Sequence, residues 1–332
     1  MAEYISTFIT GFGEAVSREL VRQLPGAKVI AVYDGLIHYR FDGDWRLLRQ
    51  ALYLNNTFYL LSSFPRGPLS FEKMVRTVCR EKHRFLISQG SYRVRFSREN
   101  QFAKVDKGIV LMAEKQVAQQ SRLRLDRVNP QTEIWYIIRS EGAGFCGQLL
   151  HKREATEKNL NKGELRPELA YLLCSCAHLS AGMLVCDPFC GYGAIPRQLL
   201  TGFSIRRVLA SDSDPQKIQA LKKGELARKF PGLSLQTADV RQLSGLAEGS
   251  LDAVITDPPW GYYEQIADME GFYREMLQEL YRVLKPGGTL ILLSARKAEF
   301  AGALENSGIR CRQRIDTLVN GKKAGVFCCV RE

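Results

Sequence analysis

The sequence lacks the features that indicate a secreted, membrane-bound or metal-dependent protein. Its nine cysteines form no C-x-x-C pair and no Cys/His set at the spacing of zinc ligands. The first residues show no basic segment followed by a long apolar run, and no uncharged apolar stretch reaches the roughly 18 residues of a membrane span. We therefore predict a cytoplasmic protein with reduced thiols and no bound metal. Four cysteines in apolar runs are expected to be buried: Cys174, Cys176, Cys328 and Cys329.

Basic residues outnumber acidic residues, and this excess is distributed unevenly along the chain. The 332 residues carry a net charge of +12, and residues 1–150 hold 22 basic against 14 acidic side chains, while the remainder holds 25 against 21. Residues 66–128 alone hold 15 basic and 6 acidic side chains. Such a bias is typical of a surface that binds phosphates, although a merely well-solvated basic protein has the same composition. The length predicts two or three domains.

The first 65 residues read as a small α+β unit. The pattern predicts a strand over residues 4–10, a helix over 13–24, a hairpin over 28–41 and a helix from Asp44 onward. The Asp34-Gly35 pair supplies the hairpin turn. Pro65, Gly67 and Pro68 then interrupt the pattern and indicate a boundary.

A second unit follows, with a basic face. A helix begins near Phe71, and residues 91–100 then alternate between apolar and basic side chains, as in a half-buried strand. A long helix over about 104–121, a short segment at 123–128 and a strand over 132–142 that continues into 144–152 complete the unit. Five basic residues are expected to cluster at one end of it and to bind RNA phosphates, or else to form an ordinary solvated face: Arg93, Arg95, Arg98, Lys104 and Lys107.

After Gly163 the sequence alternates between short apolar strands and helices, which is typical of a doubly wound α/β domain. The expected strands are residues 183–187, 206–212, 233–239, 251–257 and 284–295, and a final hairpin turns at Asn320-Gly321. The first four strands end in Asp187, Asp212, Asp239 and Asp257. One such aspartate is commonly a helix cap, but four in succession indicate a ligand site at the carboxyl edge of the sheet.

The residues around these aspartates suit a nucleoside ligand. Gly191 and Gly193 let the backbone approach a ligand, and their spacing departs from the dinucleotide fingerprint. Asp212 is placed to bind both hydroxyl groups of a ribose, and Asp239 to accept a hydrogen bond from an adenine amine.

The motifs DPFCGYG, ASDSDP, TADV and DPPW, in that order, resemble motifs I to IV of the class I S-adenosylmethionine-dependent methyltransferases. The resemblance implies S-adenosyl-L-methionine as the cofactor. It also implies the residues that bind it: Asp187, Phe189, Gly191, Gly193, Ala194, Asp212, Ser213, Asp239, Val240 and Asp257.

The tetrad Asp257, Pro258, Pro259 and Trp260 is similar to that of enzymes that methylate amino groups conjugated to planar systems. Such an amine is a weak nucleophile that must be held in line with the methyl group. The Asp257 carboxylate and the Pro258 carbonyl can accept its two N–H bonds and stabilise the developing charge, and Trp260 offers a stacking face. The tetrad contains no cysteine for C5 methylation of pyrimidines, and we assign no Lys-Asp-Lys-Glu set for ribose methylation.

Nearly the whole chain resembles the THUMP-domain RNA methyltransferases of the guanine-N2 type. The resemblance implies an N-terminal ferredoxin-like domain over 1–65, a THUMP RNA-binding domain over 66–150, a connecting helical segment over 151–180 and a Rossmann-like catalytic domain over 181–332. In the connecting segment, Arg166 and Pro167 match an L-R-P element that helps to close the cofactor site. Trp260 departs from the family's usual Tyr or Phe. Tyr262 and Tyr263 line the base pocket or pack in the core.

The implied activity is N2 methylation of a guanosine in tRNA by a chain expected to be monomeric. Alternatives are guanine-N2 methylation of rRNA, adenine-N6 methylation of RNA or DNA, and amide methylation of a protein glutamine, which the THUMP-like half disfavours. From another class, the chain could be an RNA-binding protein with a vestigial cofactor fold; its intact motif residues argue against that.

Overall fold

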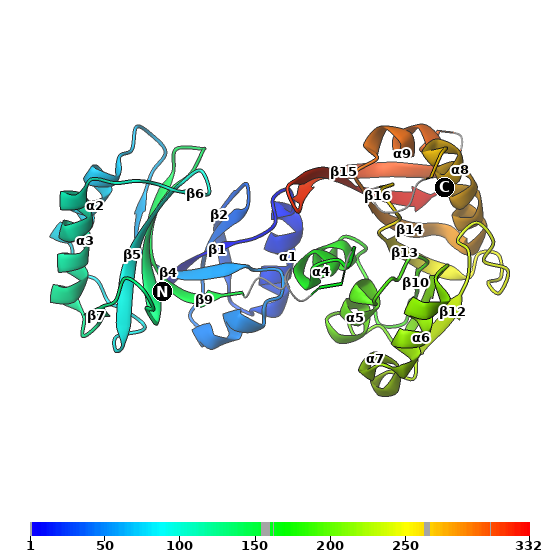
Figure 1. Ribbon diagram of the computed structural model, residues 1–332, viewed down its shortest axis with the longest axis horizontal. Coiled ribbons are helices and arrows are strands. Elements are labelled where there is room, and N and C mark those ends of the chain that lie inside the picture. Colours follow the sequence, from blue (N-terminus) through cyan, green and yellow to red (C-terminus); the bar gives the residue numbers. More distant parts are fainter. Residues whose placement is uncertain (1, 154–159, 162, 262–265, 306) are drawn as a thin grey trace. The chain divides into compact units, whose positions relative to one another are not determined.

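The structure is a computed structural model that describes residues 2–153, 160–161, 163–261, 266–305 and 307–332. Two compact units are present (Figure 1). The first holds Met1–Phe8 and Val16–Glu154, and the second holds Ile9–Ala15 and Ala155–Glu332. Each unit has its own β-sheet.

The first unit is built on one continuous sheet. Its elements are β1 (Glu3–Thr7), α1 (Gly13–Gln23), β2 (Lys28–Tyr33), β3 (Leu36–Arg40), the 3₁₀ helix η1 (Trp45–Gln50), β4 (Asn56–Phe64), α2 (Phe71–Arg80), β5 (Ser91–Arg98), β6 (Gln101–Phe102), α3 (Lys107–Gln120), β7 (Arg124–Leu125), β8 (Thr132–Ile138) and β9 (Gly144–Lys152). The strand order is β2-β3-β1-β4-β9-β8-β5-β6, and β7 pairs with β5. Because β4 pairs with β1 on one side and β9 on the other, the parts predicted as 1–65 and 66–150 share this sheet.

The local sequence explains the helices on this sheet. The Ser70 hydroxyl caps α2 by accepting a hydrogen bond from the Lys73 amide at 3.1 Å, and Asp106 caps α3. Both helices pack against the face that carries Tyr92, Phe96 and other buried side chains. The alternation predicted for β5 holds in part: Tyr92 and Phe96 are buried, but Ser97 is buried as well, and Arg93 and Arg95 are partly buried instead of exposed.

The segment between Asp44 and Pro65 differs from the prediction. Its helix is the 3₁₀ helix η1, which Asp44 caps by accepting from the Arg46 amide, and the central strand β4 follows. We did not predict β4, because its buried residues do not alternate: Thr57 and Phe58 are adjacent and both buried, and Ser62 and Ser63 interrupt the apolar run.

The second unit is a doubly wound α/β domain. Its elements are α4 (Pro167–Ser175), β10 (Leu184–Asp187), α5 (Ala194–Thr201), β11 (Arg207–Asp212), α6 (Pro215–Lys223), α7 (Glu225–Lys229), β12 (Leu233–Thr237), β13 (Leu251–Thr256), α8 (Met269–Val283), β14 (Leu284–Ser294), α9 (Lys297–Leu304), β15 (Ile309–Val319) and β16 (Lys322–Arg331). The strand order is β12-β11-β10-β13-β14-β16-β15, with β10 to β14 parallel and β16 antiparallel to its neighbours. The carboxyl ends of the parallel strands therefore meet at one edge of the sheet.

The final hairpin and the cysteines can be compared with the sequence prediction. Asn320 and Gly321 have φ angles of 50° and 77°, so the predicted tight turn is confirmed. Cys174 and Cys329 are buried, but Cys176 and Cys328 are only partly buried, which corrects that prediction. None of the nine cysteines forms a disulfide. In the described part of the chain, no helix combines the length and the apolar character needed to span a membrane.

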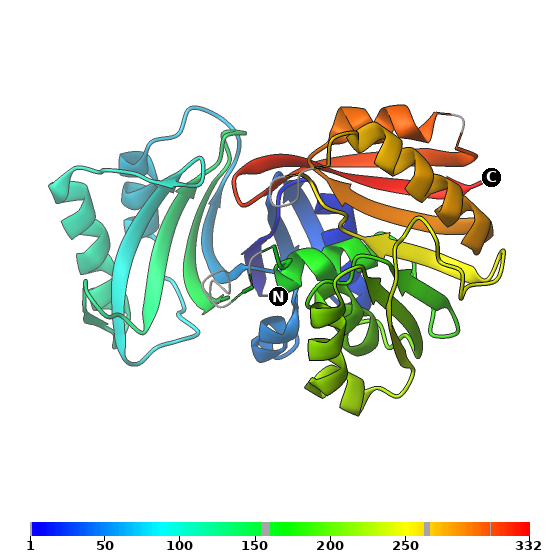
Figure 2. The same ribbon diagram turned by 45° about the vertical axis from the view of Figure 1, so that its right-hand side comes forward.

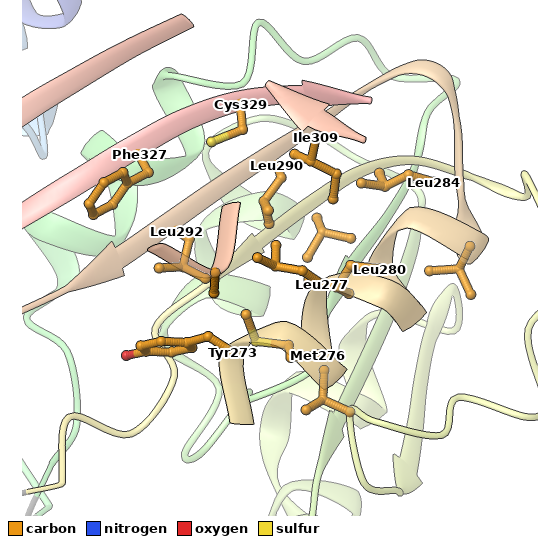
Figure 3. Packing of buried hydrophobic residues seen from close by; sticks show 14 of the residues in the cluster. Tyr273, Met276, Leu277, Leu280, Leu284, Leu290, Leu292, Ile309, Phe327 and Cys329 are labelled. Carbon is orange, nitrogen blue, oxygen red and sulfur yellow. The ribbon is translucent and has the colours of Figure 1, made fainter. Parts of the chain in front are cut away.

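A hydrophobic cluster fixes α8 and α9 on one face of the second sheet. Figure 2 shows these helices, gold to orange, beside the strands β14 to β16. Tyr273, Met276 and Leu277 of α8 point toward Leu290 and Leu292 of β14 (Figure 3). This packing fixes α8 relative to β13 and β14, and so fixes the carboxyl ends of these strands relative to the helix.

We expect Leu277→Ala to lower the free energy of unfolding by about 2 to 5 kcal/mol, because Leu277 is fully buried and the truncation leaves a cavity. The matched control is Gln278→Ala, the next residue of α8, which is exposed and should change stability by less than about 0.5 kcal/mol. Urea denaturation measures both. Equal destabilisation by the two variants would contradict the packing described above.

Candidate active site

A cavity of about 710 Å³ opens at the carboxyl edge of the second sheet. All four predicted aspartates line it, although each follows a different strand. The other predicted residues that line it are Phe189, Gly191, Ala194, Ser213, Val240, Pro258, Pro259 and Trp260. The structure thus brings together residues that are up to 73 positions apart in the sequence.

Asp187 lies at the inner wall of the cavity, at the end of β10, and is almost fully buried. It accepts hydrogen bonds from the Thr256 hydroxyl at 2.9 Å and from the Phe189 amide at 3.2 Å. Burial raises the pKa of its carboxyl to about 7. No lysine or arginine among the described residues forms an ion pair with it.

Asp212 organises the glycine turn that follows β10. One of its carboxylate oxygens accepts from the Gly191 amide at 2.9 Å, and the other accepts from the Asp214 amide at 3.0 Å. Gly191 has a φ of 51°, a conformation that glycine adopts without strain. The Lys217 ammonium lies 3.6 Å from Asp212. Asp212 therefore both shapes the turn and presents a carboxylate to the cavity.

Gly193 serves packing instead of lining the cavity. Its φ is 85°, and a Cβ there would approach the Leu221 side chain at 2.8 Å. Arg166 and Pro167 also lie outside the residues that line the cavity. They begin α4, where the Arg166 guanidinium lies 3.5 Å from Glu168. Their immediate neighbours, Glu164 and Leu165, do line it.

Asp239 reaches the cavity with its carboxylate already engaged. It accepts hydrogen bonds from the Arg241 guanidinium, the shortest at 2.7 Å, and from the Arg241 amide. These bonds lower the pKa of Asp239 below its ordinary value. Arg241 also contacts Glu275 at 3.3 Å, and it lies 5.9 Å from the ring centre of Phe272. Arg241 and Phe272 line the cavity, and sequence reasoning missed both: Phe272 is brought there by α8, whereas Arg241 directly follows the predicted Asp239 and Val240.

The Asp257-Pro258-Pro259-Trp260 segment forms the outer wall. The Trp260 indole N–H donates a hydrogen bond to one Asp257 oxygen at 2.9 Å. The Arg296 guanidinium donates to the Trp260 carbonyl at 2.9 Å, which anchors the end of the tetrad to α9. Burial raises the pKa of Asp257 to about 8. The second Asp257 oxygen and the Pro258 carbonyl are the acceptors left to a bound amine. Tyr262 and Tyr263 lie outside the described residues.

The raised pKa of Asp257 makes the stability of the free protein depend on pH. In the unfolded chain this carboxyl titrates near its ordinary value of about 3.9, whereas in the folded chain it titrates at about 8. The folded state therefore binds the proton more tightly, and this contribution to stability is lost as the pH rises from about 4 to 8. We expect Asp257→Asn to raise the melting temperature relative to wild type more at pH 9 than at pH 5. Thermal scans of both proteins test this, and a difference that shrinks with rising pH would contradict it.

The five predicted basic residues of the first unit fall into two groups, one that faces an acidic side chain and one that is exposed to solvent. Arg93 and Arg95 are partly buried on β5 and face Glu133, with the Arg93 Nε donating to it at 2.6 Å. Arg98, Lys104 and Lys107 are exposed. Arg93 and Arg98 are five residues apart on one strand, about 17 Å, and the clustering of the five basic residues for RNA binding stays a prediction.

An aromatic pair beside Arg95 was also missed in the sequence. Phe102 is 68% exposed, its ring centre lies 5.5 Å from that of Trp135, and the Arg95 guanidinium lies 4.9 Å from the Phe102 ring centre. An exposed aromatic side chain beside an arginine is a feature that base-stacking surfaces share, and Phe102 was not singled out in the sequence.

Comparison with known proteins gives a family model and several relatives. Residues 200–324 match the family described as UPF0020, RMKL-like methyltransferase domain. The tRNA (guanine(6)-N(2))-methyltransferase THUMP3 of Bos taurus is 32% identical over 211 residues, which are 57% of this chain and 40% of that protein. The tRNA (guanine(6)-N2)-methyltransferase of Thermus thermophilus is 27% identical over 222 residues, which are 65% of each chain. The matches thus span about 40 to 65% of these relatives' lengths.

The crystal structure of TrmN from Thermus thermophilus matches this chain with a TM-score of 0.80 at 22% identity and covers 100% of both chains. The predicted fold class is therefore confirmed: a Rossmann-like class I methyltransferase domain preceded by an α+β part. The resemblance to THUMP-domain guanine-N2 methyltransferases is confirmed as well. No group of three or more His, Cys, Asp or Glu residues in the described ranges could hold a metal ion.

Proposed function

We propose that this chain, a relative of the THUMP-domain guanine-N2 methyltransferases, transfers a methyl group from S-adenosyl-L-methionine to the exocyclic N2 of a guanosine in RNA, with tRNA as the favoured substrate. The observation that carries the proposal is the meeting of Asp187, Asp212 and the Asp257-Pro258-Pro259-Trp260 tetrad in one cavity. The named relatives that act on guanine N2 in tRNA support the choice of base and RNA.

The residues of the cavity fit S-adenosylmethionine. Asp187 and Asp257 are carboxyl groups with no cationic partner among the described residues, an arrangement that favours a positively charged ligand. Asp212 presents a carboxylate to ribose hydroxyls, and Phe189 and Val240 offer apolar surface to a base. When bound, the cofactor supplies a methyl group on a sulfonium. Asp239 can accept from an adenine amine only through lone pairs that Arg241 leaves open.

The tetrad would orient the target amine. In its ionised form, Asp257 accepts one N–H of the guanine amine while the Pro258 carbonyl accepts the other, which directs the nitrogen lone pair toward the methyl group. The Trp260 N–H holds the carboxylate in place, and the proline pair restricts the backbone that carries the carbonyl. Asp257 also stabilises the positive charge that develops on the nitrogen.

The first unit would bind the RNA backbone through its exposed basic residues, in the arrangement that the THUMP resemblance implies. The proposal includes a cytoplasmic location and a monomeric enzyme. Guanine-N2 methylation of rRNA and adenine-N6 methylation of nucleic acid use the same tetrad geometry and remain the alternatives. A vestigial cofactor fold would retain RNA binding but would bind no S-adenosylmethionine.

The test is methyl transfer from labelled S-adenosylmethionine to total RNA that lacks its native modifications, followed by mass analysis of the nucleosides. N2-methylguanosine in the tRNA fraction is the expected product. N6-methyladenosine as the product would show that the target base is adenine. N2-methylguanosine in the rRNA fraction would show that the substrate is rRNA. Cofactor binding without any methylated RNA would overturn the proposal.

We expect Phe102→Ala to weaken RNA binding about tenfold, because base stacking on an aromatic side chain contributes about 1 to 3 kcal/mol per base. The matched control is Leu111→Ala, which removes an exposed apolar side chain from α3 in the same unit. Electrophoretic mobility shifts with unmodified tRNA give both dissociation constants. Equal affinities for Phe102→Ala and the wild type would exclude Phe102 from the RNA-binding surface.

A further inference from the structure

The positive charge of the catalytic unit is concentrated in its last hairpin. Residues 309–332 hold six basic and two acidic side chains, whereas residues 151–308 hold 19 of each sign. The whole net charge of +4 in the C-terminal half therefore lies on β15, β16 and their turn (Figure 1). No residue that carries this charge takes part in the proposed binding of the cofactor or of the amine.

The turn of this hairpin belongs to the wall of the cavity. Val319, Asn320 and Lys322 line it together with Trp260 and Asp257. Asn320 and Lys322 are exposed, so they stand at the open side of the cavity and not in its interior. An amide and an ammonium at this place are suited to the polar atoms of a nucleotide that enters.

The strand β15 leads away from this turn along the margin of the sheet. It is the last strand of the sheet, and β16 is its only pairing partner among the described strands. At about 3.3 Å per residue its 11 residues extend about 35 Å from the cavity. Three arginines occur on it, and all are exposed: Arg310, Arg312 and Arg314. Arg310 pairs with Val330 and Arg314 pairs with Phe327, three residues apart on β16, so these two arginines lie on opposite faces of the hairpin.

A β-bulge presents the middle arginine. Cys311 pairs with Cys329 and Gln313 pairs with Cys328, so Arg312 is the extra residue without an opposite partner on β16. Arg310 and Arg314 form exposed ion pairs at 3.3 Å with Glu332 and Asp316. Such surface pairs are weak and can be exchanged for phosphates. Arg312 has no ion-pair partner in the described part of the chain.

We infer that the β15–β16 hairpin is a second RNA-binding surface, located on the catalytic unit. The turn contacts the nucleotide at the cavity, and the β15 arginines bind the phosphates of the RNA strand that flanks it. This inference rests on the proposed function. The hairpin contact is separate from the proposed RNA-binding surface of the first unit. It positions the target nucleotide at the cavity.

The test compares two variants of the full chain that each lose three positive charges. The hairpin variant is Arg310→Gln/Arg312→Gln/Arg314→Gln. The control is Lys222→Gln/Lys223→Gln/Arg228→Gln on α6 and α7, whose side chains are exposed and do not line the cavity. Methyl transfer to unmodified RNA is measured over a range of salt concentrations, and calorimetric binding of S-adenosylhomocysteine verifies that each variant is folded. Arg312→Glu supplies a single-site version that disturbs no ion pair.

The hairpin variant is expected to raise KM for RNA about tenfold or more, to change kcat less than twofold, and to lower the salt dependence of binding by about two to three ion equivalents. Arg312→Glu should raise KM in the same direction, and the control should not. KM and salt dependence that match the control would overturn the inference and leave the arginines as charges that protect the sheet edge from pairing. If the wild type methylates no RNA, the proposed function fails; the hairpin inference is then decided by comparing RNA affinities of the wild type and the variant directly.

Discussion

The substitution Asp257→Asn is expected to lower kcat for methyl transfer about 10³-fold and to leave the affinity for S-adenosylmethionine within a few-fold. Asparagine keeps the size of the side chain and can still accept the Trp260 N–H through its oxygen. It removes the negative charge, and its amide presents a donor where the target amine needs an acceptor. Loss of one preorganised group that stabilises developing charge typically costs 10² to 10³ in rate.

Single-turnover measurements with saturating RNA separate this effect from RNA binding. The matched control is Asp268→Asn, the same chemical change at the exposed N-cap of α8, where asparagine caps equally well. A kcat for Asp257→Asn within tenfold of wild type would mean that this carboxylate does not hold the reacting amine. An unchanged kcat in the control excludes a general effect of removing a carboxylate near α8.

The substitution Asp212→Ala is expected to weaken S-adenosylmethionine binding about 10²-fold or more. It removes the carboxylate proposed to bind ribose, and it also removes the acceptor that holds the Gly191 amide at 2.9 Å. The carboxylate is proposed to bind both ribose hydroxyl groups, and hydrogen bonds to a charged group contribute about 1.5 to 3 kcal/mol each, so the loss of these two bonds accounts for the change. The Gly191 bond is present in the free protein as well, so its loss acts on binding only through the shape of the turn, which lines the cavity.

Isothermal titration with S-adenosylhomocysteine measures the loss without any contribution from catalysis. The control is Asp214→Ala, two residues away, which removes the N-cap of α6 without touching the cavity. An affinity for Asp212→Ala equal to that of the control would show that Asp212 contributes only to helix capping and turn structure.

The residues of this site that could be predicted are those at the ends of apolar strands and in a tight turn. Asp187, Asp212, Asp239 and Asp257 were found from the sequence because each ends a short apolar strand, and parallel strands place their carboxyl ends at one edge. The hairpin turn was found because Asn320-Gly321 suits positive φ angles. Each of these features can be recognised from a few neighbouring residues. In the folded chain the four aspartates and Asn320 all line the cavity.

The unpredicted parts depend on packing between distant elements. Arg241 joins the cavity through its contacts with Phe272 and Glu275 on α8, and Lys322 joins it because β16 is inserted between β14 and β15. The placement of Lys322 has no signature in the neighbouring residues, whereas Arg241 directly follows the predicted Asp239 and Val240 and could have been included with them. The strand β4 was missed because its buried residues do not alternate along the chain.

The continuous sheet of the first unit has a consequence for how such proteins can be rearranged. A cut at residue 65 would leave β4 without β9, and would also separate Tyr33 and His38 from Phe145, whose ring centre lies 5.5 and 5.8 Å from theirs. The first unit, residues 2–8 and 16–153, should therefore melt as one cooperative body. A chimera that borrows the part of this chain proposed to bind RNA needs the strands on both sides of Pro65, because β4 before it and β9 after it are hydrogen-bonded in one sheet.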